Sequence, residues 1–584
     1  MNLTTHNKQQ RLAYIRSLYE QAKQAGAAQD ALFERHMKQY RGSDEIDGSA
    51  ERAGTVRNIT YEIVESQVSS SIPQPKVDPV CYTERRDRAA KAIERLCSSV
   101  RDRLPFEEMN DRDERYTYVY GSSVWFLEWD HTISTYGEAG GVRVSCLSPR
   151  DFIPQPGITH IEHMDYCFLR FSTTRAELCR TYGASEEQAA LASVEADADT
   201  ALDDNEAATV IVCFYRDADG EVGQFIFSGE LILADIEHYY RRKLPTVDGE
   251  NDHALADQTY ETVFRAILLE DRLPCEHFFT KSELCEAAEG TVLHVEELHV
   301  PYYTPSGFPI VIRKNTSGDD MLYGQSDCEF IRPEQQAINK IESRILQKLL
   351  RAGVTPIVPE DATVALNNAV FGQVIKMKPG ESAAQYGTVD TTPDISQDIA
   401  EAERLYQHAK RTLGISDAYQ GLAAASNESG YARQLQISQA GGRLDSKRTM
   451  KQAAYAAIDR LIFEYYLAYA DEERRIGYRD GNGCVQNTSF HRYDFLERDK
   501  SGAYHFSDAY LFSIDQNGGI EGRREELWEK NLKNLTSGAL GDPTDHATLL
   551  RYWQSQERAH YPFARENVEY FRDALKARGG GEVT

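Results

Sequence analysis

Residues that could perform chemistry are present in this chain, but few of them stand at the spacing that a known reaction requires. No glycine is followed directly by lysine, so the loop with which Walker-type ATPases hold nucleotide phosphates has no counterpart. His294 and His299 are five residues apart, whereas a helical zinc-protease pair requires four. Four side chains could be assembled into a zinc site on paper: Cys275, His277, Cys285 and His294. Their spacing matches no standard ligand pattern, so we interpret them as ordinary fold residues.

A second metal-like segment is the acidic run at 217–221, which begins like a calcium-binding loop. Apolar-rich stretches flank it on both sides, and Asp219-Gly220 is a dipeptide typical of tight hairpin turns. We therefore interpret 208–229 as a β-hairpin and 217–221 as its turn. The sequence predicts no metal site, no cofactor and no catalytic residue, and the expected protein is not an enzyme.

One cluster of charged residues stands out against the rest of the chain. In a helix predicted over 333–352, four basic side chains fall within about 80° of one another at 100° per residue, namely Lys340, Arg344, Lys348 and Arg351. Segment 332–352 has five basic and two acidic residues, hence a net charge of +3, in a chain of net charge −27. A solvated helix face is the more common explanation of a single basic stripe. The contrast with the acidic chain favours a surface that meets DNA, if copies of the helix form a ring.

Composition limits the class of protein. A chain of 584 residues is too long for one hydrophobic core, so two to four domains are expected. Proteins that hold nucleic acid tightly are usually basic, so a chain with 92 acidic and 65 basic residues either avoids nucleic acid or handles it without gripping it. The ten cysteines form no CxxC pair, which indicates folding in a reducing cytoplasm. The N-terminus lacks the apolar region of a signal peptide, and 461–470 is too short to span a bilayer.

The predicted elements alternate between helices and strands, which gives an α+β multidomain fold. In the first third, 84–104 reads as an amphipathic helix and 121–130 and 142–147 as strands. Thr174 and Glu177 form a predicted capping box, and its helix ends at Gly183.

The middle of the chain predicts two helices of 20 residues, 333–352 and 394–413, each about 30 Å long. Asp394 is the expected cap of the second. They bracket 353–393, so the simplest geometry is an antiparallel helix pair that carries a small α/β tip. The pair also presents apolar residues that a thin hairpin is not expected to bury alone, which predicts a homo-oligomeric ring: Ile338, Ile345, Ile399 and Leu405.

After the second helix, the sequence predicts a loop of small residues at 415–430. A long helix to about Ile476 is expected next, with a kink at Gly441-Gly442. Strands are expected at 484–515, and the last 65 residues are expected to be helical.

The order of these elements resembles that of the portal proteins of tailed bacteriophages. The resemblance lies in RNITYEIVESQVSSSIPQPKV (57–77), in YGQSDCEFIRPEQQAINKIESRILQ (323–347), which includes a Gln336/Asn339 pairing, and in GISDAYQGLAAASNESGYARQLQISQA (414–440). The last contains Ser429-Gly430-Tyr431-Ala432, where the family has a Ser-Gly-x-Ala turn. Segment 538–564 is similar to a helical portal C-terminus. The amino-acid sequence itself is closely similar only over 323–347 and 414–440.

The resemblance implies a portal-like fold with an α/β wing, a two-helix stem, a small α/β clip and a helical C-terminal crown. The implied parts are a wing at 1–330, stem helices at 331–352 and 394–414, a clip at 353–393, a tunnel loop at 415–430, further wing at 431–525 and a crown at 526–584. The tunnel-loop residues expected to face a channel are Gln420, Asn427, Glu428, Ser429 and Gly430. The basic stripe is expected to face the same channel or its subunit contacts.

Family resemblance also implies the partners and the location. Members form a ring, typically of twelve subunits, at one vertex of the capsid, and they are made in the host cytoplasm. Expected partners are the terminase large subunit, head-completion or adaptor proteins, major capsid and scaffold proteins, and double-stranded DNA that passes through without sequence specificity. No cofactor and no membrane are implied.

Two other classes of protein compete with this interpretation. One is a different structural virion protein, such as a head–tail adaptor or a capsid-associated scaffold. The other is an enzyme, such as a nuclease or a protease. The sequence assigns no role to 184–207 and 245–290, which look like insertions.

Overall fold

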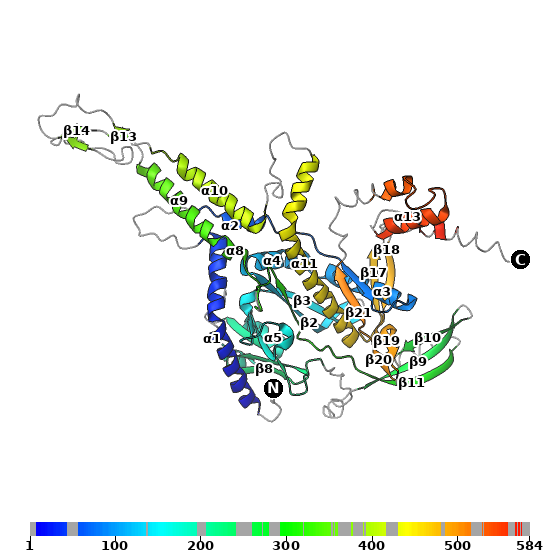
Figure 1. The fold of residues 1–584 in the computed structure, drawn as a ribbon. Helices are drawn as coiled ribbons and strands as arrows, with labels where there is room; N and C mark the ends of the chain where they lie inside the picture. The colour runs from blue at the N-terminus through cyan, green and yellow to red at the C-terminus, as the bar shows by residue number, and fades with distance from the viewer. Residues whose placement is uncertain are drawn as a thin grey trace.

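The structure is a computed structural model, and helices and strands both contribute to it (Figure 1). It describes residues 7–43, 56–135, 138–194, 206–240, 260–270, 273–279, 292–318, 321–351, 354–355, 357–359, 375–377, 389–390, 393–415, 430–479, 485–500, 502–514, 528, 531–558, 564, 567–568, 570–572 and 574. The α+β class expected from the sequence is confirmed.

Two antiparallel sheets form the centre of the body. The first has the order β12-β2-β3, with β2 at Ser122–Thr135, β3 at Glu138–Leu147 and β12 at Ile310–Lys314. The second has the order β4-β5-β6-β7-β8, with strands at Phe152–Pro154, Tyr166–Thr174, Ala207–Arg216, Val222–Ser228 and Leu231–Ile236. Phe126 of β2 packs against Phe171 and Phe214, so the two sheets share a core.

The opposite face of the five-stranded sheet is covered by the long helix α1 (Lys8–Arg41). Its residues Leu12, Ile15 and Tyr19 pack on the alternate positions of the sheet, because successive side chains of a strand point to opposite faces. The predicted hairpin is confirmed: Arg216 pairs with Val222 across a turn that has Gly220 at φ +87°. β6 is almost wholly buried because both of its faces are covered.

The two helices expected in the first third of the chain, 84–104 and the one that Thr174 caps, are also confirmed. α3 (Glu84–Arg103) buries the apolar face that the sequence predicts, and α4 (Phe106–Tyr120) follows it. α5 (Arg175–Tyr182) begins where Thr174 accepts a hydrogen bond from the Glu177 backbone, and it ends at left-handed Gly183. Three short helical elements lie near it in the sequence: the 3-10 turns Pro149–Asp151 and Ile161–His163 precede it, and α6 (Glu186–Ala189) follows it.

α11 (Gly430–Tyr469) crosses the body, and helix continues through Gly441-Gly442, where the sequence predicted an interruption. The predicted end near Ile476 is wrong, because the helix stops at Tyr469 and β17 (Arg474–Arg479) pairs with β18 (Val485–Phe490). Arg474 and Ile476 are buried while their neighbours are exposed, an alternation of period two that suits a strand.

The remaining strands lie around this body. An arm of order β10-β9-β11 comprises Leu273–Phe279, Tyr260–Glu270 and Val292–Pro301. β1 (Pro75–Pro79) pairs with β21 (Tyr510–Ile514), and β19 (Leu496–Arg498), which follows the 3-10 turn Arg492–Phe495, pairs with β20 (Tyr504–Phe506). Near the C-terminus, α13 spans His546–Arg558.

A helix pair leaves the body on the side away from the arm (Figure 1). It consists of α9 (Arg332–Arg351) and α10 (Ser396–Leu413), with the short helices α8 (Asp327–Phe330) and α2 (Ile59–Glu65) at its base. At its far end lie β13 (Val354–Thr355), β14 (Ile357–Pro359), β15 (Ile375–Met377) and β16 (Val389–Asp390). β13 pairs with β16 and β14 with β15. None of the described helices is long and apolar enough to cross a membrane.

Candidate functional site

The base of the helix pair is fixed by a small apolar core. Ile338 of α9 and Tyr406 and Leu413 of α10 pack against Ile59 and Ile63 of α2. The sequence expectation that Ile338 and Ile345 require a second chain for burial is wrong. Ile338 is fully buried within one chain because α2 supplies the third surface, and Ile345 is buried farther along.

Farther from the body, two apolar side chains of the pair remain exposed. Leu349 of α9 and Ile399 of α10 keep about half of their surface accessible, at 49% and 53%. Leu405 is partly buried against the core at the base. The outer part of the pair, not its base, therefore carries the apolar surface that one chain leaves uncovered.

Polar contacts at the base involve a residue that the sequence did not single out. The expected Gln336/Asn339 pairing is wrong, because Gln335 donates to Asn339 at 2.9 Å and Gln336 is exposed. Gln335 also donates to the Arg57 carbonyl at 2.7 Å and accepts hydrogen bonds from Thr60 at 3.0 Å. A difference of one residue turns a helical side chain by about 100°, which moves it to another face.

Two of the four predicted stripe residues are joined to the second helix. Arg344 and Lys348 both contact the carboxylate of Asp398 on α10, with Lys348 Nζ 2.5 Å from Asp398 Oδ2. Lys348, and Arg344 with it, holds the pKa of Asp398 below its ordinary value. The two cations keep 37% and 57% of their side-chain surface accessible, so they tie the helices together and still face solvent.

The structure describes only some of the other predicted site residues. Lys340 is exposed, and it has no ion-pair or hydrogen-bond partner among the described residues. Arg351 is the last residue of α9, and its side chain lies outside the described part. The tunnel-loop residues Gln420, Asn427, Glu428 and Ser429 also lie outside it, and Gly430 is the first residue of α11. Both the stripe and the loop stay predictions.

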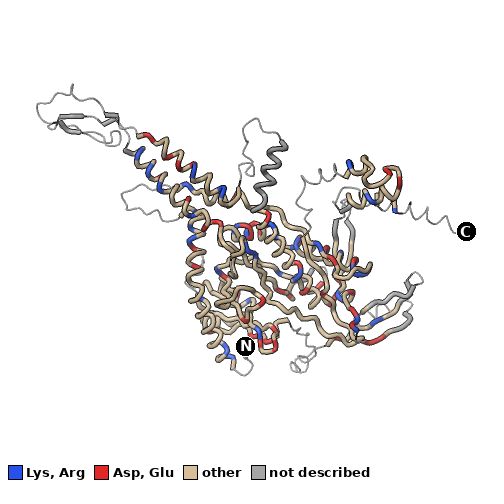
Figure 2. The backbone as a smooth tube through the Cα atoms, viewed as in Figure 1, with Lys and Arg blue, Asp and Glu red and all other residues tan. Residues whose placement is uncertain are grey.

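Charge along the helix pair is distributed unevenly (Figure 2). Lys and Arg recur along α9, whereas α10 has acidic residues toward the far end and Lys410 and Arg411 in its last turn. The expected cap is displaced by one position: Asp394 accepts from Ser396 N at 2.9 Å, but Ile395 precedes the helix. His408 lies 2.8 Å from Glu334, which adds a second polar link between the two helices.

An extended group of buried polar contacts lies where α11 crosses the body. Four α11 side chains at four-residue spacing make polar contacts inside the protein, and we name them the α11 polar row: Lys447, Lys451, Tyr455 and Asp459. Four residues correspond to slightly more than one helical turn, so the row follows one face. Sequence spacing alone does not reveal the row, because each partner lies more than a hundred residues away in the chain.

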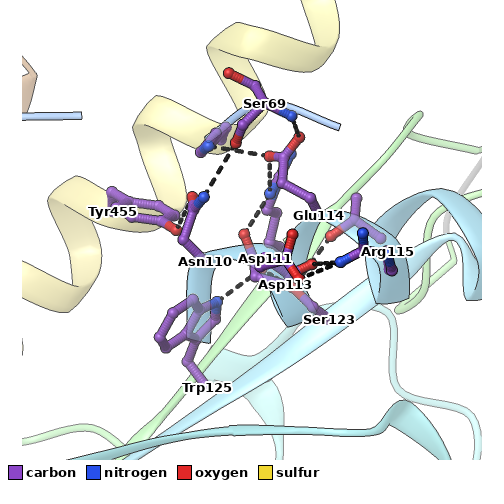
Figure 3. A network of polar contacts seen from close by, with 12 residues as sticks. Ser69, Asn110, Asp111, Asp113, Glu114, Arg115, Ser123, Trp125 and Tyr455 are labelled. Atoms are coloured by element: carbon purple, nitrogen blue, oxygen red, sulfur yellow. Dashed lines mark hydrogen bonds and ion pairs between the residues drawn. The ribbon is translucent and has the colours of Figure 1, made fainter. Parts of the chain in front are cut away.

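Every member of the row meets a different group on the body. Lys447 Nζ contacts the two carboxylate oxygens of Asp327 at 2.8 and 2.6 Å. Lys451 lies 3.1 Å from Glu114, and Asp459 lies 2.6 Å from Arg101. Tyr455 donates to Asn110 at 2.8 Å, as Figure 3 shows.

Burial and charge act in opposite directions on these groups. Burial alone raises the pKa of Glu114, but Arg313 and Lys451 outweigh it and lower the pKa. For Asp459, burial outweighs Arg101 and raises the pKa to about 6.

The row is extended by a buried network on α4 and the central sheet. Asp113 accepts hydrogen bonds from Trp125 Nε1 at 2.9 Å and from Ser123 (Figure 3). It also accepts one from Arg313. Arg313 also lies 2.8 Å from Glu114, which in turn contacts Lys451 of the row. Asp113, Glu114 and Arg313 are almost wholly buried. Because Lys451 contacts Glu114, this buried network holds α11 against α4 and the central sheet.

Comparison with known proteins does not assign a family. No protein-family model matches the chain, and no curated protein matches its sequence.

Proposed function

We propose that this chain is a portal protein of a tailed bacteriophage: one subunit of a ring through which DNA enters and leaves the capsid. The observation that carries the proposal is the pair α9 and α10, which projects from an α/β body and bears short strands at its far end (Figure 1). In this proposal the pair is the stem, 353–393 is the clip, and the body is the wing. Segment 526–584 is the crown.

The charges of the helix pair support a conduit for DNA. DNA that must move in both directions is better served by a wall to which phosphate binds weakly than by an adhesive one. Arg344 and Lys348 share Asp398, which offsets part of their attraction for phosphate. Lys340 has no such partner among the described residues. Repeated around a ring, this gives a few basic positions in a chain of net charge −27.

The exposed apolar residues support assembly. Leu349 and Ile399 lie on the outer part of the pair, where a neighbouring copy of the pair would cover them. Twelve copies are proposed for the ring. In the virion it would sit at one vertex, among capsid and scaffold proteins. The terminase large subunit, and later head-completion or adaptor proteins, would dock at the clip.

The test is DNA packaging by rings in which the stripe is neutralised. We expect replacement of Lys340, Arg344, Lys348 and Arg351 by Gln to leave rings intact and to reduce packaged or retained DNA. A matched control replaces four exposed basic residues of α3 and α4 by Gln: Arg88, Lys91, Arg103 and Arg112. Three of these, Lys91, Arg103 and Arg112, are paired with carboxylates, as Arg344 and Lys348 are in the stripe.

The two variants differ from wild type by the same charge, so only position separates them. The proposal requires that the stripe variant packages less DNA than the control variant. Equal packaging by both would make the stripe a solvated helix face.

A further inference from the structure

A cleft between the two central sheets is lined by side chains that the proposed function does not use. It has a volume of about 340 Å³, and residues of β2, β3, β5, β6, β7 and α5 line it. Its apolar lining comes from both sheets and from α5: Phe126, Phe171, Leu178, Val210, Val212 and Ile226. A cleft of this size with apolar walls and a few polar groups is the usual form of a small-molecule site.

Gln224 of β7 is buried in this cleft without a hydrogen-bond partner for its side chain. Only 7% of its surface is accessible, and its side-chain amide makes no hydrogen bond with any described residue. It shares the inner face of β7 with Val222 and Ile226, because successive side chains of a strand alternate between faces. Burying an amide without a hydrogen bond is unfavourable. The cleft is therefore better suited to a polar occupant than to an apolar one.

Glu128 of β2 lines the same cleft from the other sheet. Phe214, the cross-strand neighbour of Gln224, packs against Phe126 with the ring centroids 5.9 Å apart. Glu128 lies two residues beyond Phe126 and therefore on the same face of β2. The side chains of Glu128 and Gln224 thus enter the cleft from opposite sheets.

The carboxylate of Glu128 is only weakly compensated by its neighbours. Its ion-pair partner among the described residues, Arg143, is 3.8 Å away and lies closer to Asp130, at 2.6 Å. Burial outweighs the charge of Arg143 and raises the pKa of Glu128. The other carboxylate that lines the cleft, Glu177, accepts hydrogen bonds from two neighbours on α5. Among the charged groups of the cleft, Glu128 is thus the one that makes no hydrogen bond with a described residue.

We propose that this cleft binds a small organic primary amine. The ammonium group donates to the Glu128 carboxylate and to the carbonyl of the Gln224 amide, and the apolar body of the ligand lies against Phe126 and Phe171. An ammonium group has three donors and no acceptor, and it supplies the positive charge that Glu128 lacks. An anion of the same size would be repelled by Glu128, and a neutral alcohol would leave its charge uncompensated.

The test is titration of phenethylamine into the purified full-length protein at neutral pH, followed by saturation-transfer NMR and calorimetry. Phenethyl alcohol and hydrocinnamate have similar apolar bodies and serve as the neutral and the anionic comparison. We expect saturable binding of the amine at one site per chain. The alcohol should bind about ten-fold more weakly or worse, because it lacks the charged hydrogen bond, and hydrocinnamate should show no saturable binding.

Three variants locate the site. Glu128→Gln should weaken amine binding about ten-fold and abolish the preference for the amine over the alcohol, and Gln224→Met should weaken amine binding about five-fold, both with unchanged circular dichroism. The control Glu108→Gln removes the same charge from a side chain of α4 that is 71% exposed, and it should bind the amine as wild type does. The proposal is wrong if wild type shows no saturable binding of the amine, if the amine and the alcohol bind equally, or if Glu128→Gln binds the amine as wild type does.

Discussion

Replacing Lys447 with methionine tests whether the α11 polar row fixes the helix against the body. Lys447 is about 9% exposed and Asp327 about 1%, and Lys447 Nζ contacts both carboxylate oxygens. Methionine keeps the apolar stem but removes the charge, which leaves a buried carboxylate without its cation. Breaking a buried pair in this way costs about 3–5 kcal/mol.

The structure sets the expected value within that range. Asp327 still accepts hydrogen bonds from Gln67 at 2.9 Å and Asn315 at 2.8 Å after the change. These donors compensate part of the lost interaction, so we expect a loss near the lower end, about 3 kcal/mol in the free energy of unfolding. The double variant Lys447→Met with Asp327→Asn should recover much of this loss, because no unpaired charge remains.

The assay is urea unfolding followed by tryptophan fluorescence, to which Trp125 of the adjoining network contributes with the three other tryptophans. The control is Arg448→Met, one residue along the same helix, because Arg448 is 64% exposed and, among the described residues, pairs only with exposed Asp445. We expect a change of less than about 0.5 kcal/mol for it. Equal losses for Lys447→Met and Arg448→Met would refute the reasoning.

Two further predictions follow from other buried positions. Because the folded state raises the pKa of Asp459 to about 6, the contribution of this group to stability is complete below about pH 4 and is lost as the pH rises through about 6, by about 3 kcal/mol. The melting midpoint of wild type relative to Asp459→Asn should therefore rise between pH 7 and pH 5, and a constant difference would contradict it. Gly324→Ala should lower the midpoint strongly, because the added Cβ would lie 2.5 Å from the Gly121 carbonyl. Gly26→Ala, in open space on α1, should raise stability by about 0.5–1 kcal/mol, and the same effect from both alanines would contradict the packing argument.

Sequence periodicity predicted those parts of the fold that depend on local pattern. The β6–β7 hairpin, α3 and the two helices of the projecting pair follow from spacing, turn residues and caps that lie within a few positions of one another. The end of α11 was placed wrongly because residues 470–479 are charged and mixed, so helical spacing and strand alternation compete there. Tertiary pairing with β18 decides in favour of the strand.

The candidate site could be predicted only in part, for a related reason. The arc of the basic stripe follows from helix geometry, but its pairing with Asp398 depends on a residue 50 positions beyond Lys348. Ile338 shows the same limit, because its apolar character is evident in the sequence whereas its partner surface, α2, is far away in the chain. From the sequence alone, a buried lysine such as Lys447 cannot be distinguished from a solvated one, because its carboxylate partner Asp327 lies 120 residues away.

Electron cryomicroscopy of the purified full-length protein tests the central proposal most directly. The account predicts a closed ring, expected to contain twelve subunits, with a channel wide enough for duplex DNA. α9 and α10 should border that channel between the body and the strands at the far end of the pair, with Lys340 directed to the channel or to a subunit contact. A monomer under all salt and concentration conditions, or a ring with the helix pair on its outer surface, would contradict the account.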